Sequence, residues 1–193
     1  LVRLSRKFSG HSNKADWDRA IRLYADYYKK ISDYTDPYFM LPAGIYDLQD
    51  AGENFEREQI RNGFQLSDRF YLKSFPTWPA FRGNSGTILS QAKGLSVVGE
   101  YLDDKELQEL AYRQLDWHLG LNPFNQSLMY GAGYRFAAQY SAMSGNIVGG
   151  LPVGVQTHFN RDVPYWPAEN VYNWKEIWIH PSNRWLWIMA DFM

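Results

Sequence analysis

The 193-residue chain contains no cysteine, which excludes disulfide bonds, thiolate metal ligands and a cysteine nucleophile. It has no apolar run near the ~20 residues that span a bilayer, so we expect no membrane insertion. Runs of lysine and arginine never exceed two residues and the net charge is −1, so the basic surface of a nucleic-acid-binding protein is missing. No signal-peptide pattern is present, and we expect a natural start upstream of Leu1 or a processed one.

Aromatic residues, in contrast, are abundant. They make up 17% of the chain, with 8 Trp, 14 Tyr and 11 Phe. Planar rings fill protein cores, and they also stack on the apolar faces of sugars or bases. The hydrophobic share of 45% and the charged share of 21% are those of a soluble globular domain. A neutral ligand therefore suits the whole chain better than a polyanion.

Apolar periodicity predicts a mostly helical chain. One helix is expected from Asp16 to Tyr34 and a weaker one from Asn54 to Gln65. A helical hairpin follows over 85–102 and 105–119, separated by Asp103 and Asp104, which suit an N-cap and the positive start of the second arm.

A last helix is expected from Pro181 to Phe192, with Pro181 at its first position and His180 as its cap. Between Gly120 and His180 the chain is rich in Gly, Pro, Asn and aromatic residues and has no helical period. A connection this long is usually functional, and at most short strands are expected in the loops. Without internal repeats or flexible linkers, residues 1–193 form a single domain.

Three motifs in order along the chain resemble glycoside hydrolase family 9. The first is the string QLDWHLGLNPFNQS at 114–127, followed by MYGAGY at 129–134, which is similar to a family loop that ends a helix. The second is Val148-Gly149-Gly150-Leu151-Pro152, similar to the family's VGGP turn. The third is Glu176, in the position of the family's general acid before the final helix. Upstream, Arg82-Gly83-Asn84 lies where the family has its penultimate hairpin, so the resemblance covers about 75–193.

The resemblance implies an all-α fold, the (α/α)6 barrel of the six-hairpin glycosidases, of which this chain supplies the last hairpins and the long loops. It implies the carboxy-terminal part of a single catalytic domain in a secreted or periplasmic bacterial enzyme. The implied activity is inverting hydrolysis of β-linked oligo- or polysaccharides, with no cofactor. The remainder of the catalytic domain upstream of Leu1 is then the partner that completes the barrel.

The chain departs from the family in three places. Where the family has paired histidines and an arginine, this chain reads Phe136-Ala137-Ala138-Gln139-Tyr140, and the interval from the VGGP-like turn to Glu176 is longer. The family's catalytic base is an aspartate in a DAGD box near the start of the domain. Asp50-Ala51-Gly52-Glu53 imitates that box but lies too close to Glu176 in sequence to leave room for the intervening hairpins. A turn before a helix N-terminus is the alternative interpretation.

Inverting hydrolysis needs an acid that protonates the departing oxygen and a carboxylate that activates water, roughly 6.5–9.5 Å apart. An apolar setting keeps an acid protonated near neutral pH, and Glu176 is flanked by Trp174 and Trp178. A structural glutamate paired with Lys175 or Arg184 is the alternative. Glu169 is the rival acid, or a solvated loop residue.

Several loop residues are candidates for contact with sugars. His158 and Arg161, beside Asp162, form a mixture that orients sugar hydroxyls; the alternative is an ordered loop with a surface pair between Arg161 and Asp162. Aromatic candidates off the helical stripes are Tyr130, Tyr134, Tyr165, Trp166 and Trp174, while Trp78 lines a cleft or packs a loop. His118 lies on a helical face and is expected in the core. No histidine pair has metal-ligand spacing, so no metal site is expected.

Two other functions stay open at this point. One is a carbohydrate-binding (α/α) fragment without catalysis, which keeps the aromatic surface. The other is a different (α/α)-barrel enzyme such as a polysaccharide lyase, which uses a tyrosine or histidine as its base.

Overall fold

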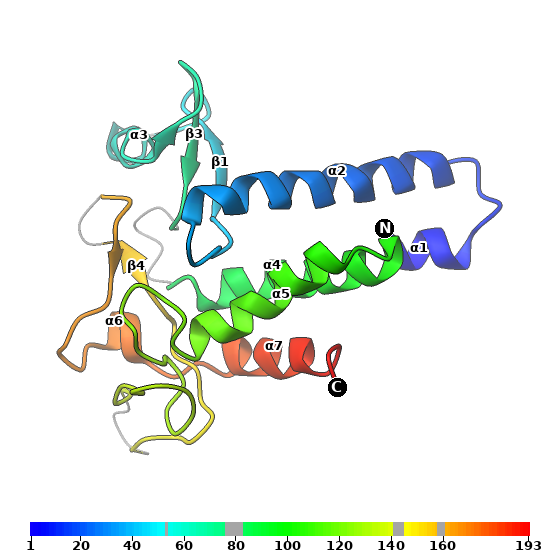
Figure 1. The fold of residues 1–193 in the computed structure, drawn as a ribbon. Coiled ribbons are helices and arrows are strands. Elements are labelled where there is room, and N and C mark those ends of the chain that lie inside the picture. Colours follow the sequence, from blue (N-terminus) through cyan, green and yellow to red (C-terminus); the bar gives the residue numbers. More distant parts are fainter. Residues whose placement is uncertain (53, 76–82, 141–144, 158–160) are drawn as a thin grey trace.

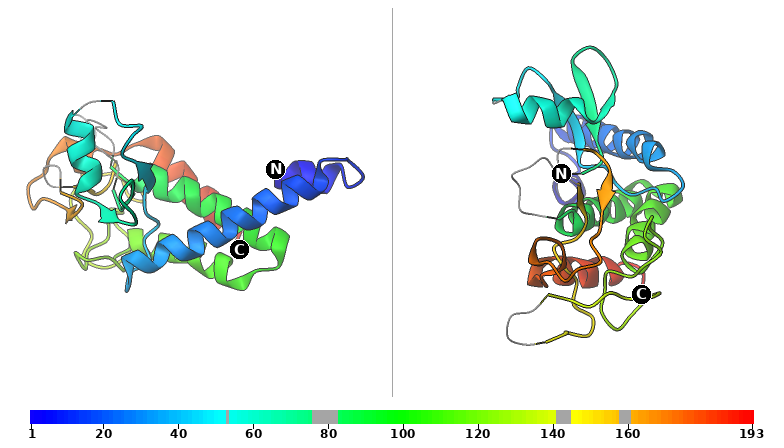
Figure 2. Two further views of the ribbon diagram at one scale, coloured as in Figure 1. Left: turned by 90° about the horizontal axis from the view of Figure 1, so that it is seen from above. Right: turned by 90° about the vertical axis from the view of Figure 1, so that its left-hand side faces the viewer.

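The computed structural model describes residues 1–52, 54–75, 83–140, 145–157 and 161–193. Helices are stacked in three layers (Figure 1). The outer layers are α2 (Lys14–Ser32) and α7 (Ile179–Met189), and the middle layer is the pair α4 (Ser85–Leu102) and α5 (Lys105–His118). A short α1 (Val2–Lys7) packs against α2 and α4. The right-hand view of Figure 2 shows the same order of layers.

The central helix, α4, is buried on most of its circumference. Ile88, Leu89, Ala92 and Leu95 lie in the main core, which extends to α5 through Leu107 and neighbouring side chains. A helix that is apolar nearly all round needs neighbours on several sides. α4 accordingly packs against α2, α5 and α7.

The predicted hairpin of α4 and α5 is confirmed nearly to the residue. Asp104 caps α5 by accepting a hydrogen bond from the Leu107 amide at 3.2 Å. Asp103, in the left-handed conformation with φ 54°, ends α4 and reverses the chain. Gly99 makes the tight crossing possible, since a Cβ there would lie 2.9 Å from the Gln108 side chain.

α7 begins earlier than predicted. Trp178 is its N-cap residue and His180 lies inside the first turn, so the expectation that His180 caps the helix was wrong. Pro181 is tolerated there because the first-turn amides have no acceptor within the helix. The regular helix ends at Met189, and the carboxylate of Asp191 just beyond it is held by Lys93 and Ser96 of α4.

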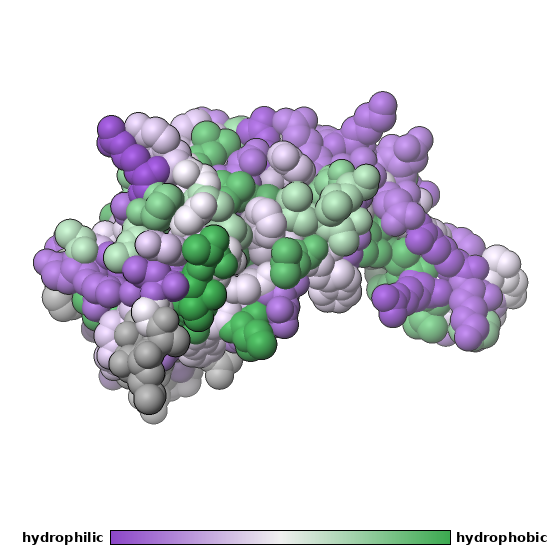
Figure 3. Space-filling model, turned by 90° about the horizontal axis from the view of Figure 1, so that it is seen from below, coloured by the Kyte–Doolittle hydropathy of each residue, from purple (hydrophilic) through white to green (hydrophobic). Residues whose placement is uncertain are grey.

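One face of α7 is exposed and apolar. Ile179, Leu186 and Trp187 are each more than half exposed. Figure 3 views the molecule from this side and shows apolar residues gathered between hydrophilic ones. A groove of about 740 Å³, which Trp187 also lines, is formed by residues of α1, α2, α4 and α7, among them Val2 and Ile21. Within the described residues, no helix is both long and apolar enough to span a bilayer.

A small antiparallel sheet lies beside one end of α2 (Figure 1). Its strand order is β1 (Gly44–Asp47), β3 (Phe70–Lys73) and β2 (Phe64–Gln65), and α3 (Asn54–Arg61) packs against it. The helix predicted to reach Gln65 therefore ends at Arg61. Gly63 explains the change, because a Cβ there would lie 2.3 Å from the Leu72 carbonyl oxygen, where β3 approaches.

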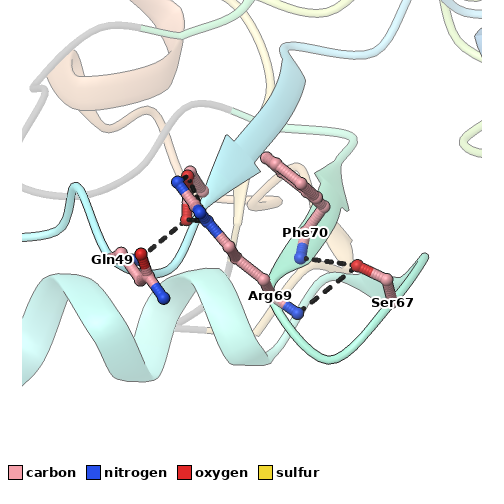
Figure 4. Close-up of polar contacts among 5 residues, drawn as sticks. Gln49, Ser67, Arg69 and Phe70 are labelled. Carbon is pink, nitrogen blue, oxygen red and sulfur yellow. Dashed lines mark hydrogen bonds and ion pairs between the residues drawn. The ribbon is translucent and has the colours of Figure 1, made fainter.

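Polar contacts close the tip of this sheet (Figure 4). The guanidinium of Arg69 pairs with Asp47 across β1 and β3, with Nε 2.6 Å from Oδ2, and lowers the pKa of that carboxyl. The hydroxyl oxygen of Ser67 accepts hydrogen bonds from the amides of Arg69 and Phe70. The amide of Gln49 donates to Asp47 Oδ1 at 2.9 Å.

The remaining elements are short: the 3-10 turn Asp33–Thr35, the hairpin of β4 (Gln156–Thr157) and β5 (Pro164–Tyr165), and α6 (Tyr172–Lys175). The long loops that contain β4, β5 and α6 gather at one end of the helical layers (Figure 1). The chain is thus mainly helical with a small sheet, and the (α/α)6 barrel stays a prediction from the motifs.

Candidate active site

The segment around Glu176 is held in place by backbone hydrogen bonds to two other loops. The Val153 amide donates to the Glu176 carbonyl oxygen at 2.9 Å, and the Trp178 amide donates to Leu151 at 3.1 Å. On the other side, the Tyr140 amide donates to Lys175 at 2.9 Å. Bonds on both sides fix the backbone position of Glu176.

The VGGP-like turn forms one of these supporting loops. The Gly150 amide donates to the Ile147 carbonyl oxygen at 3.0 Å, and Gly149 has φ +79°, a conformation that favours glycine. A Cβ on Gly150 would lie 3.1 Å from the Ile177 side chain. The two glycines therefore let the turn lie close against the segment of Glu176.

The start of α4 anchors the same loop to the core. The buried side chain of Asn84 accepts a hydrogen bond from the Val155 amide at 3.0 Å, and the backbone amide of Asn84 donates to the Val155 carbonyl oxygen at 2.9 Å. The Ser85 amide donates to Val153 at 3.2 Å. A Cβ on Gly83 would lie 2.4 Å from the Val153 carbonyl oxygen, so only glycine fits there. Glu176 is thus connected to the most buried helix through 153–155.

Among the described residues, the half-buried carboxylate of Glu176 has one hydrogen-bond partner. Its Oε2 accepts from the indole Nε1 of Trp178 at 2.8 Å. Neither ion pair expected of a structural glutamate is present: Lys175 donates to the Ala168 carbonyl oxygen at 3.1 Å, and Arg184 donates to Gly86 at 3.3 Å. Within the described residues, Oε1 has no hydrogen-bond partner, so it can receive or give a proton to a ligand.

Lys175, the residue before Glu176, packs against Trp166. Lys175 is buried, which lowers the pKa of its ammonium, and Nζ lies 5.4 Å from the centroid of the Trp166 ring. The indole nitrogen of Trp166 donates to Gln126 Oε1 at 3.0 Å. One face and the polar edge of Trp166 are therefore engaged within the protein, which leaves only its other face for a sugar.

Trp174 is half-buried, and its ring meets Tyr165 edge-on with centroids 5.5 Å apart. Trp174 precedes Lys175 in the sequence, and Trp166 contacts the ammonium of Lys175, so both tryptophans belong to the same group of loops. The indole nitrogen of Trp174 is buried and has no partner among the described residues.

Tyr130 and Tyr134 lie on the loop that follows α5. Tyr130 contacts Phe136 edge-on at 5.0 Å, while Tyr134 is 51% exposed with the Arg135 guanidinium 5.0 Å above its ring. No described contact joins these two tyrosines to Glu176. We therefore place both tyrosines outside the group of residues that contact Glu176.

The polar and glycine residues of the first motif stabilise the fold of this loop and do not supply catalytic groups. Asn122 donates to the carbonyl oxygens of Trp117 and Gln126 at 2.8 and 2.9 Å. The buried Ser127 hydroxyl accepts from the Met129 amide at 3.1 Å. Gly133 has φ +75°, and a Cβ there would lie 2.4 Å from the Leu119 carbonyl oxygen.

The predicted pair of Arg161 and Asp162 does not form. Asp162 instead accepts hydrogen bonds from the amides of Ser74 at 2.8 Å and Phe75 at 3.2 Å, and lies 3.3 Å from the buried ammonium of Lys73. Burial lowers the pKa of Lys73. Asp162 therefore fastens the loop to β3, while Arg161 is exposed. His158, with Trp78, Arg82 and Glu53, lies outside the described residues.

The first three residues of the DAGD-like box, Asp50-Ala51-Gly52, have the alternative structure, a turn before a helix. Asp50 is exposed in a turn, where its amide donates to Asp47 at 3.1 Å, and the Gly52 amide donates to Glu56 at 3.0 Å just before α3. The turn before a helix is confirmed. The rival acid Glu169 is exposed. No group of three potential metal ligands gathers among the described residues.

His118 is a core residue, as predicted. It is fully buried, and its Nδ1 lies 2.6 Å from the Gln114 carbonyl oxygen. Burial lowers its pKa to about 4, so the imidazole is neutral at pH 7. Its Nε2 has no partner among the described residues.

The sequence did not reveal a cavity of about 340 Å³ that is lined by two neighbours of Glu176, although not by Glu176 itself. Val153 and Trp178, which bond to the backbone and side chain of Glu176, both line it, together with Gly86, His180 and Arg184. The only signal was the spacing of Trp178, His180 and Arg184 around the start of the last helix. Their partners on α4 lie far away in the sequence.

No known family model, curated protein or solved structure matches the chain. The resemblance to glycoside hydrolase family 9 therefore depends on the three sequence motifs.

Proposed function

We propose that the chain is the carboxy-terminal part of an O-glycosyl hydrolase with Glu176 as its general acid. The observation that carries this proposal is the setting of the Glu176 carboxyl. Its backbone is fixed on both sides, one oxygen is held by Trp178, and the residues that hold it also line a cavity. Preorganised placement of an acid against a bound glycosidic oxygen is what acid catalysis requires.

In the reaction, the protonated carboxyl of Glu176 gives its proton to the departing glycosidic oxygen. A second carboxylate takes a proton from water, which attacks the anomeric carbon from the opposite face and inverts its configuration. We assign this base to the segment upstream of Leu1, because Asp50 forms a turn next to the sheet. The exposed face of α7 and the groove of about 740 Å³ suit the packing of further helices from that segment.

The experiment uses the natural full-length protein and compares Glu176→Gln with Glu169→Gln as a matched control. Reducing ends released from β-linked glycans are measured, together with glycan binding. We expect Glu176→Gln to lose cleavage by about 10²–10⁴-fold while binding persists, and Glu169→Gln to keep it.

Wild-type turnover by Glu176→Gln would exclude this residue as the acid. Binding without any cleavage by the wild type would instead favour a carbohydrate-binding fragment. Products that absorb in the ultraviolet through a new double bond would identify a lyase.

A further inference from the structure

The cavity that Trp178 lines lies between the first two turns of α4 and of α7. Gly86 and Thr87 contribute from α4, His180 and Arg184 from α7, and Val153 and Trp178 from the loops. Its volume of about 340 Å³ is at the lower end of ~300–1,000 Å³, the usual size of small-molecule sites. The space suits a single sugar residue.

Among the described residues, basic side chains line the cavity and no acidic one does. Arg184 and His180 line it, and none of its other lining residues is Asp or Glu. Arg184 is half-buried, and its Nη1 donates only a long hydrogen bond, 3.3 Å, to the Gly86 carbonyl oxygen. Within the described part of the chain, no carboxylate lies at ion-pair distance from Arg184. The planar guanidinium has several donors that match a carboxylate.

Gly86 makes room for the side chains of Arg184 and His180 over α4. A Cβ at this position would lie 3.2 Å from Arg184 Nη1 and 3.4 Å from His180 Nε2. The first turn of α4 adds the positive end of its helix dipole, and the side chain of Asn84 does not cap it because it holds Val155. The local charge of the cavity is therefore positive although the chain as a whole is nearly neutral.

Trp178 connects this cavity with the acid. Its indole nitrogen donates to Glu176, and its ring lies 5.2 Å from the His180 ring, centroid to centroid. An aromatic ring offers a flat apolar surface to the face of a sugar. Glu176 is not among the residues that line the cavity, so a sugar there would reach the acid through Trp178, the side chain that both share.

We propose that this cavity is a subsite for a uronic acid residue, whose carboxylate pairs with Arg184 while its ring packs on Trp178. The inference rests on the proposed function and gives it a substrate class: a glycan with carboxylate-bearing sugars. It replaces the neutral ligand expected from net charge, because recognition depends on the charges that line the site.

The test measures calorimetric binding of two oligosaccharides that differ only in a glucuronic acid or a glucose residue. The natural full-length protein is used with Glu176→Gln, so that no substrate is consumed. We expect at least tenfold tighter binding of the glucuronic acid ligand, decreasing with salt. Arg184→Gln removes this preference, while Arg22→Gln, the same charge change on the exposed surface of α2, keeps it.

Equal affinity for the two ligands, or a preference that survives Arg184→Gln, overturns the proposal. Thermal unfolding is measured for each variant, and if Arg184→Gln unfolds, Arg184→Lys takes its place: it keeps the charge but loses the planar pairing, so the preference falls severalfold. Cleavage is assayed separately with Glu176 intact. Cleavage without preference for the uronate contradicts the subsite alone, and preference without cleavage contradicts the hydrolase alone.

Discussion

Replacing Asn84 with alanine removes the acceptor that holds the loop 153–155 on α4. Asn84 is 2% exposed, and its Oδ1 lies 3.0 Å from the amide nitrogen of Val155, which is itself fully buried. The variant leaves that amide without its side-chain acceptor. A buried unsatisfied donor costs about 1–3 kcal/mol, so we expect the free energy of unfolding to fall by about 2 kcal/mol.

The same change affects the acid, because Val153 in this loop donates to the backbone of Glu176. We expect kcat for glycan cleavage to fall by about 10–100-fold with a smaller change in KM, since a displaced acid weakens the transition state more than substrate binding. Urea unfolding gives the stability, and steady-state kinetics on the natural full-length protein give kcat and KM.

Asn84→Asp is the matched control for this prediction. It keeps an oxygen acceptor for Val155 and places a negative charge at the N-terminus of α4, where such a charge is favourable. The control should retain most of the stability and of kcat. The reasoning is refuted if Asn84→Ala unfolds at the wild-type urea concentration, or if Asn84→Asp loses as much as Asn84→Ala.

Two further predictions concern buried charges. The pKa of His118 falls from 6.5 in the unfolded chain to about 4 in the fold, so the neutral imidazole stabilises the fold fully above pH 6.5, and about 3 kcal/mol of the free energy of unfolding is lost as the pH falls towards 4. Urea unfolding at pH 7 and pH 4.5 should show a smaller loss of this free energy in His118→Leu than in the wild type. An equal loss contradicts the assignment. Asp162→Asn leaves Lys73 buried without its counter-charge and should lower the free energy of unfolding by about 3–5 kcal/mol. The double variant with Lys73→Met should largely restore this free energy. Additive losses in the double variant would show that the pair is not coupled.

The helices α2, α4, α5 and α7 were predictable because each has a strong local signal, whereas the short α1 and α6 carry none and were not predicted. The stripe of Ile21, Tyr24 and Tyr28 identified α2, and Asp104 marked the start of α5. The sheet was not located, because β2 has two residues and its pairing with β3 depends on the close approach at Gly63, which only the folded chain defines. Short strands carry too few residues to show alternation.

The candidate site was predictable only in part for the same reason. Glu176 and Trp178 are two residues apart, so their neighbourhood could be expected from the sequence. Asp162 bonds instead with Lys73 and Ser74, and Arg184 reaches Gly86, which are partners from distant parts of the chain. Contacts of this kind are determined by tertiary packing, so no local sequence pattern predicts them.

The role of Glu176 as a general acid is tested most directly by the dependence of cleavage on the leaving group. The rates of wild type and Glu176→Gln are compared on a β-linked glycan and on an aryl glycoside whose phenol leaves without protonation. The account predicts that the variant loses about 10²–10⁴-fold on the glycan but keeps most of the wild-type rate on the aryl glycoside. Equal losses on both substrates, or no loss on either, would contradict it.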